Sequence, residues 1–267
     1  QITTDRWEYL KLRLGDQLAA SRSDFYDEVV WTFLLGLAYV AGGPEGIRSL
    51  EAKLSGHPAQ SCHLVWLEAL PIPPRRSEGN TNVDLAIGAI GEREGSEGGI
   101  EFDPSLGNSV TFCEMKWYSD LSKNVTNDQH RNQLSRIIEN AVVFQGKGAL
   151  VERVTVTLVT PEIFVGTEPK SRLYHYKLEE YRSDPSILLR EWRRSYALMA
   201  KRKDQPGWEY PDDSHIESLL RDRFSLRHLS FEELFCEAPR SEFSPLMEAF
   251  LQASNGASRR FGAHSFP

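Results

Sequence analysis

The spacing of apolar residues along the chain switches between a helical and a strand-like period. Apolar positions three to four residues apart predict amphipathic helices, whereas short runs rich in β-branched residues predict strands. On this basis the predicted helices are 5–19, 25–41, 45–55 and 127–144. The predicted strands are 62–70, 82–90, 109–118 and 153–161. This order is typical of an α/β fold with a mixed central sheet.

The C-terminal part of the chain is more charged and less regular. Residues 168–204 have the composition of charged helices, and "FSLRHLSFEELF" (224–235) predicts a short strand that leads into a helix. The end of the chain is polar and contains glycine, which favours a loose tail. We expect one domain over 1–267, with a core at 25–165, a helical C-terminal elaboration at 166–253 and the tail at 254–267.

Composition and charge narrow the class of protein. Hydrophobic residues make up 40% of the 267 positions, enough for a sizeable core, yet no apolar run is long enough to span a membrane. No signal peptide is visible, and three scattered cysteines without CxxC spacing indicate a reducing, cytoplasmic setting. The net charge of −7 counts against nucleic-acid binding without excluding it, since the distribution of charge matters more.

The third predicted strand carries two charges inside an apolar stretch, "VTFCEMKWYS" (110–119). Glu114 and Lys116 are two residues apart, so both side chains project from the same face of the strand. Two other Glu-x-Lys triplets, at 51–53 and 168–170, lie in or next to helical patterns, where charges are ordinary. In an apolar strand a charge needs a partner or a metal ion, so the setting marks this pair as a candidate site.

The preceding strand supplies a second carboxylate, Asp84, which stands alone among apolar neighbours in "TNVDLAIGAI". If the two strands pair as a hairpin, Asp84 and Glu114 lie side by side. Two close carboxylates repel each other unless a cation sits between them, and Mg²⁺ takes oxygen ligands of this kind. The pattern predicts a Mg²⁺ site, with Mn²⁺ as an alternative. Lys116 could then orient or deprotonate a water, or neutralise a phosphate.

A third carboxylate, Glu28, opens the apolar stretch of the helix predicted at 25–41. No further charge follows it until Glu45. Such a position suits a site residue that borders the core. It equally suits an ordinary acid in the first turn of a helix, favoured by the helix dipole. Both roles stay open for Glu28.

In the order of its charged residues and elements, the chain resembles the PD-(D/E)XK nuclease superfamily. The pattern is Glu28 on a first helix, Asp84 on a strand, then Glu114 and Lys116 on the next strand, followed by a helix and a strand. The resemblance covers residues 25–161. It implies a restriction-endonuclease-like core: a helix, a three-stranded antiparallel meander, a helix and a strand.

The resemblance also implies roles for these residues. Asp84 and Glu114 would be metal ligands, joined by the backbone carbonyl of Met115. Lys116 would position the attacking water, and Glu28 would hold a metal-bound water or a second ion.

Many members of the superfamily carry a further polar residue on the helix that follows the lysine strand. Gln133 is the candidate here, with Arg131 and Arg136 as rivals. The implied activity is metal-dependent hydrolysis of phosphodiester bonds, in DNA rather than RNA. Enzymes that cut both strands are often dimers, and a homodimer stays open.

Two basic segments are candidates for binding a nucleic-acid backbone. Arg75 and Arg76 join the first predicted strand to the Asp84 strand and could grip a phosphate, although loop arginines are commonly just solvated. Arg193 and Arg194 lie with two aromatic residues in "LLREWRRSYALMAKRK", a combination that suits nucleic acid. The same pattern fits an ordinary amphipathic helix with buried aromatics.

The sequence therefore leaves three possible functions open. The first is a Mg²⁺-dependent nuclease, which the acidic residues and the lysine favour. The second is an inactive module of the same fold that binds nucleic acid or a protein partner, which the net acidity favours. The third is a soluble α/β domain in which Glu114 and Lys116 merely form an ion pair.

Overall fold

The computed structural model describes residues 28–59, 64–75, 81–117, 119–122, 131–165, 172–196, 207–249 and 251–252. The helix predicted at 5–19, Arg76 and the tail predicted at 254–267 lie outside these residues. The strands of the central sheet are β1 (Val65–Ala69), β2 (Val83–Gly88), β5 (Ser109–Met115), β8 (Arg153–Thr160) and β9 (Phe224–Ser230). Two small hairpins are formed by β3 (Ile90–Glu92) with β4 (Ile100–Phe102), and by β6 (Gln145–Gly146) with β7 (Ala149–Leu150).

The helices of the described residues include α2 (Glu28–Ala41), α3 (Gly43–Ser55), α4 (Gln133–Val142), α5 (Leu173–Ser183), α6 (Ser186–Tyr196), α7 (Asp213–Asp222) and α8 (Phe231–Cys236). Residues 244–249 and 251–252 are also helical. A short 3-10 helix, η2 (Glu162–Phe164), follows β8. Within the part of the chain that the structure describes, no helix is both long and apolar enough to cross a membrane.

The central sheet is mixed, with the strand order β1-β2-β5-β8-β9. β1, β2 and β5 form an antiparallel meander, and β8 and β9 run parallel to β5. The prediction of an α/β fold with a mixed sheet is therefore confirmed. The strand predicted within 224–235 is β9, which pairs with β8, so the sheet extends beyond the core predicted at 25–165.

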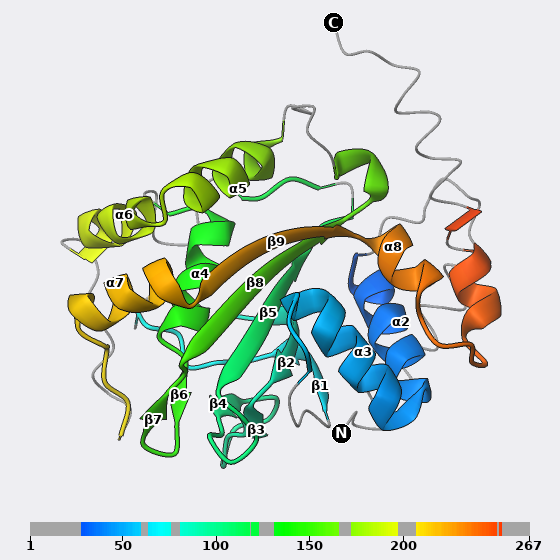
Figure 1. Ribbon diagram of the computed structural model, residues 1–267, viewed down its shortest axis with the longest axis horizontal. Coiled ribbons are helices and arrows are strands. Elements are labelled where there is room, and N and C mark those ends of the chain that lie inside the picture. The colour runs from blue at the N-terminus through cyan, green and yellow to red at the C-terminus, as the bar shows by residue number, and fades with distance from the viewer. Residues whose placement is uncertain are drawn as a thin grey trace, which may run out of the picture.

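Helices cover both faces of this sheet (Figure 1). α2, α3 and α8 lie on one face, where they pack against Cys113 and Met115 of β5. α4, α5, α6 and α7 lie on the other face, where the core includes Val110 and Phe112 of the same strand. Successive strand residues point to opposite faces, so β5 divides its apolar side chains between the two layers.

α4 connects β5 to the parallel strand β8, as a helical crossover usually does. Asn132 caps this helix, its side chain accepting a hydrogen bond from the backbone N–H of Ser135 at 2.9 Å. Leu134, Ile137 and Ile138 are buried at helical spacing and fix the inner face. The crossover brings the first turn of α4 to the end of the sheet where β5 stops, and the candidate site lies there.

Candidate active site

Asp84 and Glu114 lie on neighbouring strands at the carboxyl end of β5. The antiparallel ladder pairs Leu85 with Cys113, so one step further along the strands brings Asp84 opposite Glu114. Leu85 and Cys113 face the α2 and α3 layer, and the alternation of strand side chains directs the two acids to the α4 face. The antiparallel pairing expected for these strands is confirmed, with β3 and β4 inserted between them.

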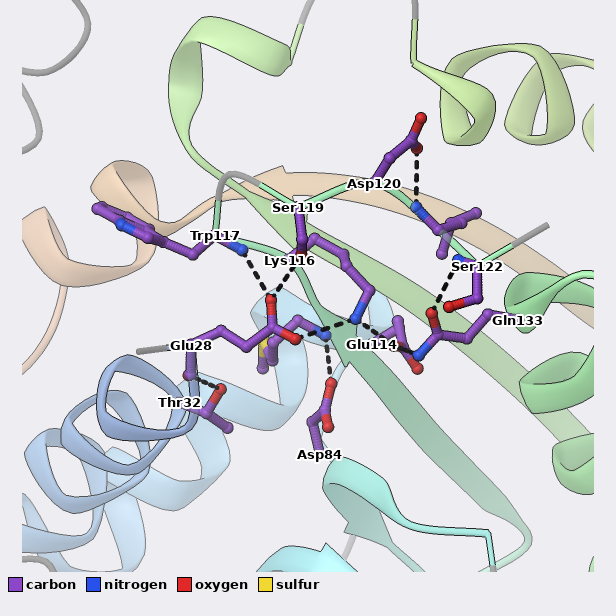
Figure 2. A network of polar contacts seen from close by, with 12 residues as sticks. Glu28, Thr32, Asp84, Glu114, Lys116, Trp117, Ser119, Asp120, Ser122 and Gln133 are labelled. Atoms are coloured by element: carbon purple, nitrogen blue, oxygen red, sulfur yellow. Dashed lines mark hydrogen bonds and ion pairs between the residues drawn. The ribbon is translucent and has the colours of Figure 1, made fainter. Parts of the chain in front are cut away.

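The Asp84 carboxylate holds the backbone of β5 where the ladder ends. The N–H of Met115 donates a hydrogen bond to Asp84 Oδ2 at 2.7 Å (Figure 2). The last backbone pair of this ladder is Leu85 with Cys113. Beyond it, the Asp84 side chain accepts the backbone N–H of Met115 in place of a strand carbonyl. Asp84 fixes the position of the residue between Glu114 and Lys116 in this way.

The Lys116 ammonium lies between two carboxylates. Its Nζ is 2.8 Å from Glu114 Oε1 and 3.1 Å from Glu28 Oε1, and the side chain is only 7% exposed. The backbone N–H of Lys116 donates to the carbonyl of Val159 on β8 at 2.9 Å. Both ends of the residue are therefore held, the backbone by the sheet and the ammonium by the two acids.

Glu28, the first residue of α2, reaches this lysine from the opposite layer, across the end of β5 (Figure 2). Its second oxygen, Oε2, accepts hydrogen bonds from the N–H of Trp117 at 3.2 Å and the hydroxyl of Ser119 at 2.9 Å. The rings of Trp31 and Trp117 pack 5.4 Å apart between centroids and attach α2 to the same segment. Glu28 thus clamps the chain that leaves β5.

Gln133 approaches from the other side, at the first position of α4 (Figure 2). Its amide Nε2 donates to Glu114 Oε1, and its Oε1 accepts the N–H of Ser122 at 3.3 Å. Of its two rivals, Arg131 is fully buried and forms an ion pair with Glu139 of α4. Gln133 is the candidate that donates a hydrogen bond to Glu114.

Burial and neighbouring charges alter the pKa values of the site. Burial and the adjacent Glu114 charge raise the pKa of Asp84 well above its usual value. Burial also raises the pKa of Glu114, although Lys116 opposes the shift. Burial alone would lower the pKa of Lys116, but the carboxylates of Glu114 and Glu28 raise it overall. The lysine is therefore a fixed positive charge at neutral pH, and not a base.

Two carboxylates of the site, those of Asp84 and Glu114, are oxygen ligands of the kind that a hard divalent cation takes. A cation between Asp84 and Glu114 would relieve the repulsion and the burial that raise the pKa of Asp84. Among the described residues, hydrogen bonds reach Asp84 through Oδ2 and Glu114 through Oε1, which leaves one oxygen of each acid to an ion. No group of three or more His, Cys, Asp or Glu side chains in this part of the chain is arranged to hold a metal ion.

The structure corrects the prediction for Arg75, which required a solvent-exposed loop residue. The side chain is fully buried. Its guanidinium makes a two-point contact with the Glu139 carboxylate of α4, at 3.2 Å and 3.1 Å, and also bonds the hydroxyl of Ser195. Arg75 therefore presents no charge to a substrate. A buried carboxylate on a distant helix explains its burial, because each charge needs the other in the interior.

Arg193 and Arg194 lie exposed on α6, away from the end of β5 in the view of Figure 1. Arg193 forms ion pairs with Asp213 at 3.1 Å and with Glu217 at 3.0 Å, both on α7. Trp192 is fully buried, and its indole N–H donates to Ser135 at 3.0 Å. The burial of Trp192 is what an ordinary amphipathic helix predicts. A substrate contact by Arg193 or Arg194 stays a prediction.

Two serines that contact the site residues, Ser119 and Ser122, were not identified from the sequence. Ser119 bonds Glu28, and Ser122 exchanges two hydrogen bonds with Gln133, through Oε1 at 3.3 Å and from the Gln133 N–H at 3.1 Å. Loop serines serve many local purposes, so no spacing signal distinguishes these two.

No protein-family model, curated protein or solved structure matches this chain. Because a fold by itself does not define a function, the function has to come from the chemistry of the site.

Proposed function

We propose that this protein is a Mg²⁺-dependent nuclease that hydrolyses phosphodiester bonds, with DNA as the favoured substrate. One observation carries the proposal: Asp84 and Glu114 lie opposite each other on neighbouring strands at one end of the sheet, with the Lys116 ammonium 2.8 Å from Glu114. Two acids suited to a metal ion beside a fixed positive charge are what hydrolysis of a phosphodiester requires.

The order of elements supports a restriction-endonuclease-like core. α2 precedes the antiparallel strands β1, β2 and β5, and α4 and β8 follow. The β3–β4 and β6–β7 hairpins are then insertions, one before β5 and the other before β8. The four elements that carry Glu28, Asp84, Glu114 and Gln133 belong to this core.

Asp84, Glu114 and the backbone carbonyl of Met115 would hold Mg²⁺, with Mn²⁺ as an alternative. When bound, the ion would polarise the phosphate and activate a water for attack. Asp84 contributes twice in this arrangement, because it also accepts the N–H of Met115 and so orients the peptide next to the carbonyl ligand.

Lys116 supplies positive charge to the reacting phosphate. The carboxylates of Glu114 and Glu28 keep its ammonium protonated, so it donates hydrogen bonds and does not take up a proton. A cation placed in advance stabilises the negative charge that develops in phosphoryl transfer, and it can orient the attacking water. Glu28 and Gln133 act as positioning residues, the first on Lys116 and the second on Glu114.

Cleavage assays test this proposal directly. Plasmid DNA, single-stranded DNA and RNA are incubated with MgCl₂, with MnCl₂ and with chelator, using wild type, Asp84→Asn and Lys116→Ala. We expect metal-dependent cleavage by the wild type and a loss of about 100-fold or more in both variants. Asp222→Asn, which alters an exposed carboxylate on α7, is the control and should cleave normally.

Normal cleavage by Asp84→Asn would refute the assignment of the site. Binding of nucleic acid without cleavage of any substrate would instead identify an inactive binding module. Thermal unfolding of each variant shows whether lost activity reflects lost structure.

A further inference from the structure

A second basic residue, Arg136 of α4, lies close to Glu114 of β5. It is one turn beyond Gln133, and residues three apart share a face of a helix. Helical side chains lean toward the helix N-terminus, so Arg136 is directed back toward the end of β5. The guanidinium is close enough to Glu114 to lower the pKa of that acid, against the effect of burial.

Among the described residues, Arg136 is a half-buried arginine with no carboxylate in ion-pair contact. Its side chain is partly buried, and its Nε is buried without a hydrogen-bond partner. Among the described residues it forms no ion pair, whereas Arg75, Arg131 and Arg193 each pair with a carboxylate. Glu114 interacts with Arg136 electrostatically, but among the described residues no ion pair joins them, and the direct contacts of Glu114 Oε1 are with Lys116 and Gln133.

The buried Nε of Arg136 has no hydrogen-bond partner among the described residues, which is unfavourable for the protein alone. Removing a charged group from water costs free energy unless a partner of opposite charge replaces the water. A planar guanidinium donates two parallel hydrogen bonds to a phosphate, a geometry that a lysine ammonium cannot reproduce. A phosphate oxygen from outside the chain would therefore suit Arg136 as a partner.

The formal charge of the site points to the same occupant. The three carboxylates of Asp84, Glu114 and Glu28 exceed the two positive charges of Lys116 and Arg136 by one. A divalent cation turns this excess into a single positive charge, which suits a singly charged phosphodiester. A protein carboxylate would satisfy Arg136 too, but it would bring no phosphate to the metal ligands.

We propose that Arg136 binds a phosphate of the nucleic-acid substrate beside the Asp84 and Glu114 acids. This inference rests on the proposed nuclease function and deepens it. Arg136 is then a substrate-binding residue that supplies, from α4, the phosphate contact that the buried Arg75 does not make.

Binding and cleavage are measured with Arg136→Ala, Arg136→Lys and the control Arg153→Ala. Arg153 is an exposed arginine at the start of β8, the end of the sheet opposite to the site. Binding of fluorescein-labelled duplex and single-stranded DNA is followed by anisotropy in CaCl₂ and in chelator, over a series of salt concentrations. Cleavage is followed in MgCl₂, with KM and kcat determined separately.

For Arg136→Ala we expect affinity for DNA to fall about ten-fold or more, as for a lost hydrogen bond to a charged group. The slope of log affinity against log salt should fall by about one, the signature of one lost phosphate contact. Arg136→Lys should keep the slope and recover part of the affinity. KM should rise more than kcat falls, and Arg153→Ala should behave as wild type.

Affinity and KM of Arg136→Ala equal to those of the Arg153→Ala control would overturn the inference, even if the wild type is an active nuclease. A wild type that binds DNA through Arg136 but cleaves nothing would sustain the inference and refute the nuclease proposal. A wild type that neither binds nor cleaves nucleic acid would refute both.

Urea unfolding separates this role from a structural one. Since Arg136 has no ion pair to lose, Arg136→Ala should unfold at the same urea concentration as wild type or at a higher one. A clearly lower midpoint would mean that the guanidinium stabilises the fold, and would count against a substrate-binding role.

Discussion

Replacing Lys116 with methionine tests whether its ammonium neutralises buried acids. Methionine keeps much of the length and the apolar contacts of the lysine side chain but removes the charge. Two contacts disappear, the one of 2.8 Å to Glu114 Oε1 and the one of 3.1 Å to Glu28 Oε1. The change therefore isolates the electrostatic contribution of Lys116 from its packing.

The two contacts differ in weight because the two acids differ in burial. Glu114 has a side chain only 4% exposed, and removing one partner of a buried ion pair costs about 3–5 kcal/mol. Glu28 has a side chain 31% exposed, and a pair of that kind contributes at most about 1 kcal/mol. Protonation of Glu114 or Asp84, whose pKa values are already raised, limits the total. We expect the free energy of unfolding to fall by about 2–4 kcal/mol in chelator.

Urea denaturation followed by tryptophan fluorescence measures this change, at about pH 7 with chelator and with MgCl₂. An ion that binds only the native state at 100 times its dissociation constant adds about 2.7 kcal/mol of stability. In Lys116→Met the ion replaces a missing positive charge, so the gain from MgCl₂ should be larger than in wild type. Lys53→Met, which breaks a more exposed pair with Glu237, should change stability by under about 1 kcal/mol.

Two results would contradict this account of Lys116. If Lys116→Met is as stable as the wild type in chelator, the ammonium does not neutralise buried acids. An equal response of both proteins to MgCl₂ would show that no cation takes up the freed position.

Two further predictions concern stability away from the site. Glu139→Gln leaves two buried guanidinium groups without a counter-charge, so the free energy of unfolding in urea should fall by about 3–5 kcal/mol. Glu217→Gln, which breaks an exposed pair, should cost under about 1 kcal/mol, and equal effects would contradict the difference in burial. Burial lowers the pKa of His228 to about 3, so below about pH 6.5 the unfolded chain binds a proton that the native state does not. Stability should therefore fall as the pH falls, by at most about 2 kcal/mol between pH 6.5 and 5, and a His228→Gln variant with the same pH profile would refute this.

Local pattern was sufficient to predict the strands and the grouping of acids on them. Alternation along a strand depends only on neighbouring residues, so the shared face of Glu114 and Lys116 could be read from their spacing. The setting of Asp84 between apolar residues likewise predicted a partner on the next strand. The amphipathic period predicted a helix over 127–144, whereas the choice of Gln133 within it came from the superfamily resemblance; among the described residues the helix begins at Gln133.

Partnerships between distant segments could not be predicted in this way. Arg75 is sequestered by Glu139, which lies 64 residues away, and nothing in the loop around Arg75 indicates that a carboxylate faces it. Glu28 contacts Lys116 only because α2 crosses the end of β5, a matter of layer packing and not of helix composition. Arg136 became distinct from Arg131 only through the ion pair that Arg131 forms with Glu139 and that Arg136 lacks among the described residues.

The sequence by itself therefore determined which side chains share a face, because periodicity is a property of a single element. Only the tertiary structure decided which charges are paired and which stay available, because pairing depends on where separate elements meet. In this protein the arginines illustrate the difference. Arg75 forms a buried ion pair with Glu139, whereas Arg136 lies beside the acids of the site without an ion pair among the described residues.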